Sequence, residues 1–281
     1  MVTDELRWTS LADDADQVPA LMAIERDVPP FLGEFTAAPR EQLATVDPSL
    51  SWVVAEGDLP VAAVRAARLR WDGTLDDAPA GGAGQAVRRA GEANADTLAV
   101  LDVSVAFGAR GRGVGAAILR ALPDRAIGAG LARTLVLIRP HAKATYPLVP
   151  FARYLSFTLA DGRPFDPWVR AAWSAGLVPV RGVDRSLIGR ADVASFERWL
   201  GVVVPGSGPY LLEGAIKPAI VEVERDEGRY REPHLWMAPR IRDDAPGDLP
   251  APTWVEALAA AGVVAGDRAH REVRRRFVTA D

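Results

Sequence analysis

Residues 97–122, TLAVLDVSVAFGARGRGVGAAILRAL, place an apolar run directly before three closely spaced glycines and a second run with helical periodicity. We predict a β-strand over 97–105 and a helix over 114–129. The N–H groups of such a strand-to-helix turn point outward together, and the helix start adds about half a positive charge. Glycine lets this backbone approach an anion closely, since no Cβ intervenes. The turn RGRGVG (110–115) is therefore suited to hold a phosphate or pyrophosphate.

Two familiar nucleotide motifs do not fit this turn. A dinucleotide-binding fingerprint needs G-x-G-x-x-G after a first strand and an acidic residue about 20 positions later. Here the glycines of 111–115 run G-x-G-x-G and lie in mid-chain. A P-loop needs G-x-x-x-x-G-K-[ST], which the sequence does not contain. A tight turn that binds no ligand stays open as the alternative.

The composition excludes several classes of protein. Of 281 residues, 49% are hydrophobic and 25% charged, which is typical of a globular domain. A net charge of −4 argues against bulk nucleic-acid binding, although the basic run REVRRRF (271–277) leaves an RNA contact open. The absence of cysteine excludes disulfides and thiolate metal sites, and three scattered histidines argue against a histidine-based metal site.

Targeting signals are missing from the sequence as given. The N-terminus lacks a signal-peptide pattern, and no run approaches the ~18 apolar residues of a membrane span. We therefore expect a cytoplasmic protein with no membrane and no nucleic-acid partner. The abundance of Ala, Arg, Val and Asp suggests a bacterial source. A homodimer is left open.

Strands and helices alternate along the chain, and no linker divides it convincingly. We predict strands over 6–11, 50–56, 59–71, 97–105, 132–140 and 178–190, and a hairpin over 219–239 turned at 225–228. We predict helices over 13–27, 39–46, 85–95, 114–129, 166–177 and 191–201, with Asp166 as an N-cap. The segment 28–35 breaks the pattern, and 140–165 is long and irregular. The tail 241–281 holds two short helical runs, around 253–262 and 266–276.

The arrangement V-x-V-x-x-x-x-R-G-x-G-V-G-x-x-[IL]-L over Val103–Leu119 resembles the acyl-CoA-binding motif of the GNAT superfamily of acyltransferases. That superfamily carries R/Q-x-x-G-x-G/A at the start of a helix, directly after a central strand. Its turn binds the CoA pyrophosphate through consecutive N–H groups, and its strand offers hydrogen bonds to the pantetheine arm. The resemblance implies that acetyl-CoA or another acyl-CoA binds at Val103, Val105, Arg110, Gly111, Arg112, Gly113, Val114 and Gly115.

The resemblance extends over roughly residues 5 to 240. More narrowly, the chain is similar to a bacterial subgroup of the superfamily. The resemblance implies an α/β fold with a mixed, mostly antiparallel central sheet flanked by helices, and a C-terminal strand hairpin within one domain, 1–240. The tail 241–281 follows that domain. The segments that carry the likeness are LRWDGTLDDAPAGG, RPHAKATYPLVPFARY, DGRPFDPWVR, FERWLG, GPYLLEGAIKP and DEGRYREPHLW.

By this resemblance the protein is an acyltransferase that moves an acyl group, in first place acetyl, from acyl-CoA to an amine, with no metal. Two alternatives stay open. Some GNAT-like domains decarboxylate malonyl-CoA or use other acyl carriers, and a non-catalytic acyl-CoA-binding protein would share the same turn.

Acyl transfer to an amine needs an acid that protonates the leaving thiolate. In many superfamily members this acid is a tyrosine four residues before a glycine that ends a helix. Counting back from Gly176 gives Ala172, which cannot donate a proton. We therefore expect Tyr146 or Tyr154, in the irregular segment, to supply the proton. Anchoring of a loop is the alternative role for each.

The transfer also needs a base for the ammonium group. Asp102 and Ser104 share the strand face opposite Val103 and Val105. An unpaired carboxylate buried in so apolar a strand would cost several kcal/mol, so Asp102 is the first candidate base. The alternative is a structural role, in which Asp102 pairs with a neighbouring arginine or caps a loop. Glu34 in the sequence FLGEF is the second candidate.

The segment 139–154 concentrates cationic and aromatic side chains just past a central strand. Ligands of open α/β sheets bind outside the carboxyl ends of strands, and long connections of this kind are often functional. We expect Lys143 or Arg153 to pair with a carboxylate of the acceptor, and Ser104 to contact it. The predicted acceptor is thus a small molecule with a carboxylate or similar anion beside its amine, and the segment 140–165 is long enough to close over it. A simple surface loop is the alternative.

Overall fold

The strand predicted over 97–105 forms β4 (Thr97–Val105), which lies inside a nine-stranded sheet of the described residues. The computed structural model of the chain describes residues 6–240 and 252–264. The strand order is β1-β2-β3-β4-β5-β9-β8-β7, and β6 pairs with β9. Only β4 and β5 run parallel in this part of the chain. The expected mixed, mostly antiparallel sheet is confirmed.

The other strands are β1 (Arg7–Ser10), β2 (Ser51–Glu56), β3 (Leu59–Leu69), β5 (Arg133–Ile138), β6 (Leu177–Ala191), β7 (Gly208–Tyr210), β8 (Ala219–Glu222) and β9 (Glu227–Pro239). The described helices are α1 (Val18–Glu25), α2 (Pro30–Val46), α3 (Gly82–Arg89), α4 (Val114–Gly128), α5 (Phe151–Leu155), α6 (Pro167–Ser174), α7 (Val193–Leu200) and α8 (Trp254–Ala260). None of the described helices is both long and apolar enough to cross a membrane.

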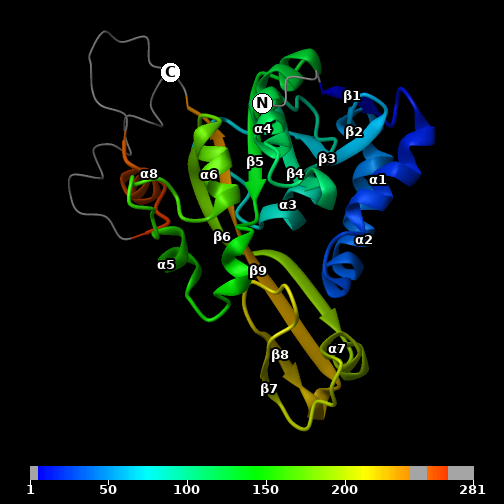
Figure 1. Ribbon diagram of the computed structural model, residues 1–281, viewed down its shortest axis with the longest axis vertical. Helices are drawn as coiled ribbons and strands as arrows, with labels where there is room; N and C mark the ends of the chain where they lie inside the picture. The colour runs from blue at the N-terminus through cyan, green and yellow to red at the C-terminus, as the bar shows by residue number, and fades with distance from the viewer. Residues whose placement is uncertain (1–5, 241–251, 265–281) are drawn as a thin grey trace.

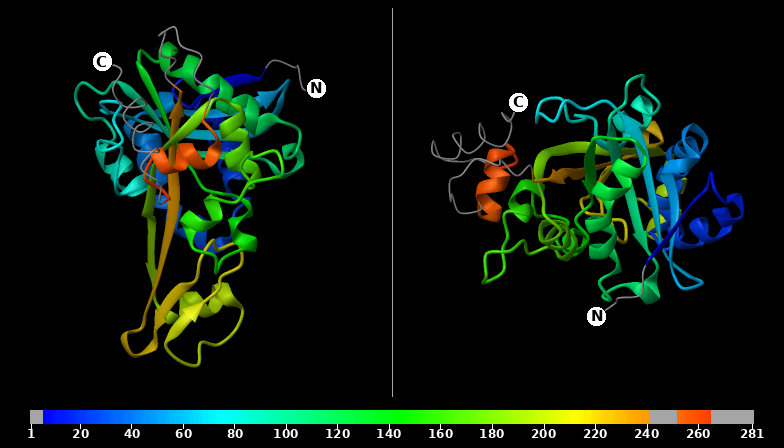
Figure 2. Two further views of the ribbon diagram at one scale, coloured as in Figure 1. Left: turned by 90° about the vertical axis from the view of Figure 1, so that its left-hand side faces the viewer. Right: turned by 90° about the horizontal axis from the view of Figure 1, so that it is seen from above.

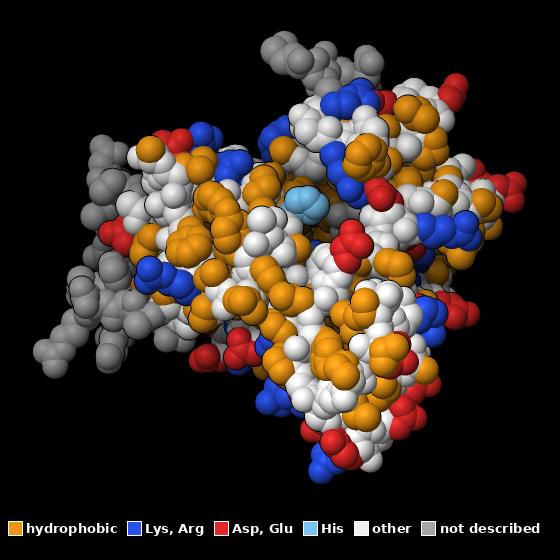
Figure 3. Space-filling model, turned by 60° about the horizontal axis from the view of Figure 1, so that its bottom comes forward, with side chains coloured by type: hydrophobic (Ala, Val, Ile, Leu, Met, Phe, Trp, Pro, Cys, Tyr) orange, Lys and Arg blue, Asp and Glu red, His pale blue; other side chains and the backbone are white. Residues whose placement is uncertain are grey.

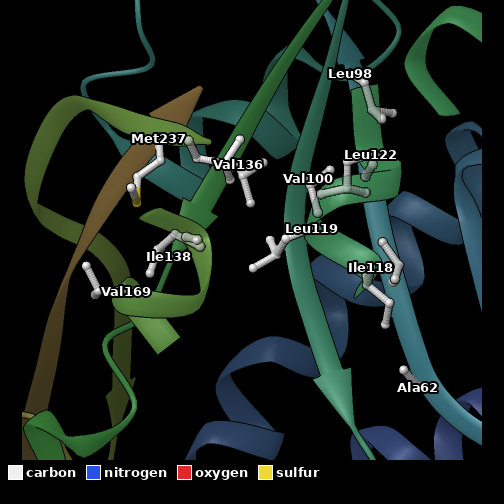
Figure 4. Packing of buried hydrophobic residues seen from close by; sticks show 14 of the residues in the cluster. Ala62, Leu98, Val100, Ile118, Leu119, Leu122, Val136, Ile138, Val169 and Met237 are labelled. Carbon is white, nitrogen blue, oxygen red and sulfur yellow. The ribbon is translucent and has the colours of Figure 1, made fainter. Parts of the chain in front are cut away.

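Helices cover both faces of the sheet, as the views in Figures 1 and 2 show. On one face α4, α6 and α8 contribute to the largest apolar cluster, together with Val100 of β4 and Val136 of β5. Figure 4 shows Ile118, Leu119 and Leu122 of α4 directed toward these strands. On the other face α1, α2 and α3 pack over β2, β3 and β4. We call these the α4 face and the α2 face.

The strands β6 and β9 extend together beyond the rest of the sheet and carry α7, β7 and β8 at their far end (Figure 1). This lobe has its own apolar cluster, in which Phe196 and Tyr230 are fully buried. Phe31 at the start of α2 packs edge-on against Tyr230, with ring centroids 5.1 Å apart. The predicted hairpin over 219–239 is confirmed, and it joins this lobe to the central sheet.

Two segments differ from the predicted elements. The expected break over 28–35 is wrong, because α2 begins at Pro30 and continues to Val46. Proline is tolerated in the first turn of a helix, where its missing N–H would have no partner. The segment 140–165 contains α5 and a 3₁₀ helix, η4 (Ala142–Thr145).

The helix predicted around 253–262 is confirmed as α8, and it packs on the core formed by the preceding residues. Trp254 is 1% exposed, and its indole N–H donates to the carbonyl of Leu155 at 2.7 Å. The ring also packs edge-on against Trp173. The second helical run of the tail, around 266–276, and the basic run 271–277 lie outside the described residues.

Candidate active site

The parallel strands β4 and β5 pair only over their first halves. Their register runs from Thr97 opposite Arg133 to Val100 opposite Val136, and then stops. Figure 4 shows the two strands diverging from this point, with Leu119 of α4 between them. The residues 101–105 of β4 therefore keep β3 as a partner and have no strand partner on their other edge within the described chain. Their unpaired edge is open to hydrogen bonds from an extended ligand.

A β-bulge lies where the divergence begins. Arg65 of β3 pairs with Asp102 and Ala66 pairs with Val100, so Leu101 is the extra residue. A bulge shifts the alternation of side chains by one position. Val103 and Val105 consequently pack on the α4 face. Asp102 lies on the α2 face, where its carboxylate contacts α2.

The glycine turn that follows β4 is open to solvent. Gly111 and Gly113 have φ of 74° and 89°, and a Cβ at either would meet no atom within 4 Å. The N–H of Arg110 donates to Phe107, and the next N–H with a recorded partner is that of Ala117. The six N–H groups of 111–116 have no partner among the described residues. A helix start with free N–H groups is a ready anion site.

The two arginines of the turn pair with carboxylates. Arg110 lies 2.7 Å from Asp27, and its Nε donates to the carbonyl of Val105. Arg112 lies 2.7 Å from Glu56. Both guanidinium groups are 40% or more exposed, where ion pairs contribute little and can exchange partners. Each can therefore turn toward an anion bound at the turn.

Asp102 belongs to a network of charges beneath α1 and α2. Arg40 of α2 donates to its carboxylate from Nε at 3.0 Å and from Nη2 at 2.5 Å, and Ser104 donates to it at 3.2 Å. Burial opposes the charge of Arg40, but Asp102 and Glu25 outweigh it and raise the pKa of Arg40. The arginine pairing is therefore the observed arrangement of Asp102, and its side chain is still 28% exposed.

A second buried cluster joins β5 to β9, and sequence reasoning missed it. Glu232 is 0% exposed and accepts from Nε of Arg139 at 2.7 Å, from Tyr230 at 2.5 Å and from a histidine, His234, at 2.8 Å. Burial would raise its pKa, but Arg139 and His234 outweigh burial and lower the pKa of Glu232 to about 2. The sequence did contain a clue, since Glu232 is a charged residue at a position of the predicted hairpin where the alternating pattern places an inward-facing side chain.

The chain resembles a curated N-acetyltransferase in sequence and a solved GNAT domain in fold. No family model matches the chain. The arginine N-acetyltransferase avaD of Aspergillus versicolor is 29% identical over 158 residues, which are 50% of this chain and 54% of that protein. The chain thus spans about half the length of this curated relative. The loading GNATL domain of CurA from Lyngbya majuscula matches with a TM-score of 0.50 and 16% identity, over 64% of this chain and 87% of that domain. The described part of the chain has the GNAT fold.

A further solved structure, the GphF GNAT-like decarboxylase in complex with isobutyryl-CoA, is 15% identical with a TM-score of 0.47, over 65% of this chain and 90% of that one. Within this fold, the remaining residues singled out from the sequence lie in three places: at the start of α4, on α2, and in the segment 140–165.

Gly115, the last glycine of the GNAT motif, serves helix packing. A Cβ at Gly115 would lie 2.6 Å from Cζ3 of Trp168 in α6, well inside contact distance. α4 and α6 can approach each other because this position lacks a side chain. Gly111 and Gly113 provide the open turn, and Gly115 fixes the helix behind it.

We expect Gly115→Ala to lower the free energy of unfolding by about 1–3 kcal/mol, because the new methyl group overpacks the contact with Trp168. Urea unfolding measures this change. Gly128→Ala is the matched control, since Gly128 lies in the same helix and its Cβ would meet no atom within 4 Å. Equal stability of the two variants would remove the packing role of Gly115.

Glu34 lies on the exposed side of α2 and joins this helix to α7. Its carboxylate lies 3.2 Å from Arg198 and accepts from the indole N–H of Trp199 at 2.9 Å. Among the described residues, no hydrogen bond or ion pair connects Glu34 with β4 or with the glycine turn. The structure does not bring it together with Asp102.

The two candidate tyrosines differ in their burial and in the hydrogen bonding of their hydroxyl groups. Tyr154 is 1% exposed and donates its hydroxyl proton to Asp166 at 2.8 Å. Burial and the negative charge of Asp166 raise the pKa of Tyr154. Asp166 is also the predicted N-cap of α6, which is confirmed by its bonds to the N–H groups of Trp168 and Val169. Tyr146 is 38% exposed and packs edge-on against Phe165.

The two candidate cations differ in the same way. Lys143 is 1% exposed, and its ammonium group donates to the carbonyls of Tyr146 at 2.6 Å and Ile216 at 2.8 Å. Burial, with help from Lys217, lowers the pKa of Lys143 to about 8. Lys143 therefore ties the loop to the segment around Ile216. Arg153 is exposed on α5, with its guanidinium over the ring of Phe157.

Proposed function

We propose that this protein transfers an acyl group, in first place acetyl, from acyl-CoA to the amine of a small molecule that also carries an anionic group. The observation that carries the proposal is the row of free N–H groups at 111–116, directly beside the unpaired edge of β4. The pyrophosphate of CoA would bind at the turn, with Arg110 and Arg112 beside it. The amides of the pantetheine arm would pair with β4 at the level of Val103 and Val105. The acyl-CoA supplies the activated carbonyl.

The acceptor would lie on the α2 face of β4. Asp102 and Ser104 present a carboxylate and a hydroxyl there, and Arg40 holds the carboxylate in place. Asp102 is proposed as the group that attracts the acceptor ammonium. Of the two tyrosines, Tyr146 is the better proton donor to the leaving thiolate, because the hydroxyl of Tyr154 is already bound to Asp166.

The acceptor is proposed to carry a carboxylate beside its amine. Arg153 has no carboxylate partner among the described residues and can bind an acceptor carboxylate through two parallel hydrogen bonds. The curated relative is named an arginine N-acetyltransferase. L-Arginine has both groups, so it is the first acceptor to test.

The test measures CoA thiol released from acetyl-CoA in the presence of L-arginine, agmatine and a panel of other amines. The chain has no cysteine, so no protein thiol reacts with the thiol reagent. We expect L-arginine to react faster than agmatine, which lacks the carboxylate, and Arg153→Leu to raise the KM for L-arginine roughly tenfold. The dissociation constant of acetyl-CoA should stay unchanged.

Other results point to other functions. Acetyl-CoA binding without thiol release from any amine would indicate a binding protein. Release of CO₂ from malonyl-CoA would indicate a decarboxylase. A preference for agmatine would contradict the anionic acceptor, and the transfer itself would stand.

A further inference from the structure

His234 combines deep burial with an unsatisfied ring nitrogen. Its side chain is 10% exposed, and its Nε2 lies 2.8 Å from the carboxylate of Glu232. Its Nδ1 is buried and has no hydrogen-bond partner among the described residues. Most buried polar atoms of native proteins are bonded, so an orphaned one calls for a physical reason.

Glu232 determines which nitrogen of His234 carries the proton. The pKa of Glu232, lowered to about 2, keeps it a carboxylate that only accepts hydrogen bonds. In the neutral imidazole the proton must therefore sit on Nε2, and Nδ1 keeps its lone pair. Arg139 and Tyr230 donate hydrogen bonds to Glu232 and fix its carboxylate. The fixed carboxylate orients the imidazole ring of His234.

His234 also lies where the sheet opens. β5 ends at Ile138, which pairs with Leu235 of β9. His234 directly precedes Leu235 in β9, so it lies just beyond the end of β5. On this edge of β9 the following strand partner is β8, which begins to pair at Arg229. The residues of β9 in between pair with β6 on their other edge, but on this edge no strand lies beside them among the described residues. On the other side of β5, β4 has diverged by the same level.

The side chains on the two sides of this opening share one face of the sheet. Leu235 belongs to the cluster of the α4 face, whereas Trp236 packs with α3 on the opposite face. The alternation of β9 therefore places His234 with Trp236, on the α2 face. Asp102 lies on the same face of β4. Viewed from below, the surface is hollowed near its centre, and side chains of both charge signs lie around the hollow (Figure 3).

We propose that His234 is the general base of the reaction and that Glu232 and Arg139 position it. This assignment rests on the proposed function. The ammonium of the acceptor gives one proton to Nδ1, from which it passes to solvent. The amine lone pair then forms the new bond to the thioester carbonyl carbon, and the carbon–sulfur bond breaks. The second proton of the nitrogen ends on the sulfur, so the products are an amide, CoA thiol and one free proton.

The test compares His234→Gln with the wild type. The amide nitrogen of glutamine can still donate to Glu232 in place of Nε2–H, but it offers no base in place of Nδ1. We expect the kcat for thiol release to fall about 100-fold, the usual scale for one acid–base group. Acetyl-CoA should bind within twofold of wild type. In His234→Ala, added imidazole should restore part of the rate. His141→Gln is the matched control and should keep its rate, since the His141 side chain is exposed.

The assay uses L-arginine or the best amine of the panel, and water as the acceptor if no amine reacts. A His234→Gln variant that binds acetyl-CoA and keeps the wild-type rate overturns the assignment and leaves the proposed function intact. A wild type that binds acetyl-CoA but releases no thiol with amines or water also overturns it. A wild type that does not bind acetyl-CoA shows instead that the proposed function has failed.

Discussion

Gly113→Asp is expected to abolish acetyl-CoA binding, with an affinity loss of about 1000-fold or more by calorimetry. Two physical effects act together. The position has a φ of 89°, which a residue with a Cβ adopts only with strain. The new carboxylate would also stand at the start of α4, where the free N–H groups would hold the pyrophosphate, and like charges repel. Undiminished binding would remove the CoA assignment of this turn.

Gly130→Asp is the control that distinguishes a local effect at the turn from the general effects of an added charge and backbone strain. Gly130 follows the other end of α4, has a φ of 72°, and its Cβ would meet no atom within 4 Å. The same substitution there adds the same charge and the same kind of strain, about one helix length away. We expect Gly130→Asp to bind acetyl-CoA as the wild type does. An equal loss in both variants would indicate a general loss of structure.

Glu232→Gln should lower the free energy of unfolding by about 3 kcal/mol at pH 7, because Arg139 and His234 lose their shared buried carboxylate. The folded-state pKa of about 2 lies below the ordinary 4.5, so Glu232 contributes its full stabilisation above pH 4.5. That stabilisation is lost as the pH falls from 4.5 toward 2. Urea unfolding of both proteins at pH 7, 5, 4 and 3 should show the difference shrinking.

Glu227→Gln is the control on the same strand. Its carboxylate pairs with Arg229 at the surface, and exposed pairs contribute little to stability. We expect this variant to unfold like the wild type at every pH. A Glu232→Gln difference that stays constant from pH 7 to pH 3 would contradict the buried carboxylate as its source.

The central elements could be predicted because their signals are local. The periodicity of 97–105 and 114–129 and the glycines between them lie within a few turns of chain, and β4 and α4 form as expected. The start of α2 could not be predicted, because PPFLGEF reads as a break. What makes it helical is the burial of Phe31 and Leu32 against the lobe carried by β6 and β9. That lobe is formed some 160 residues later in the chain.

Of the candidate site, only the glycine turn could be located from the sequence alone. The turn is contiguous in sequence, so its role can be inferred from its pattern. The partners of the polar groups are not contiguous, since Arg40 and Asp102 are 62 positions apart and Arg139 and Glu232 are 93 apart. No periodicity links such pairs. The sequence therefore indicated Asp102 without its partner and missed His234.

The extra residue Leu101 determines which face of the sheet each later side chain of β4 occupies. With it present, Asp102 and Ser104 share the side of α2, and two valines complete the apolar layer beneath α4. Deletion of this one residue would move every later side chain of the strand to the opposite face of the sheet. A carboxylate and a hydroxyl would enter the apolar layer, and two valines would lie on the α2 face. In a library of single-residue deletions, this position should be among the least tolerant, although its own side chain performs no chemistry.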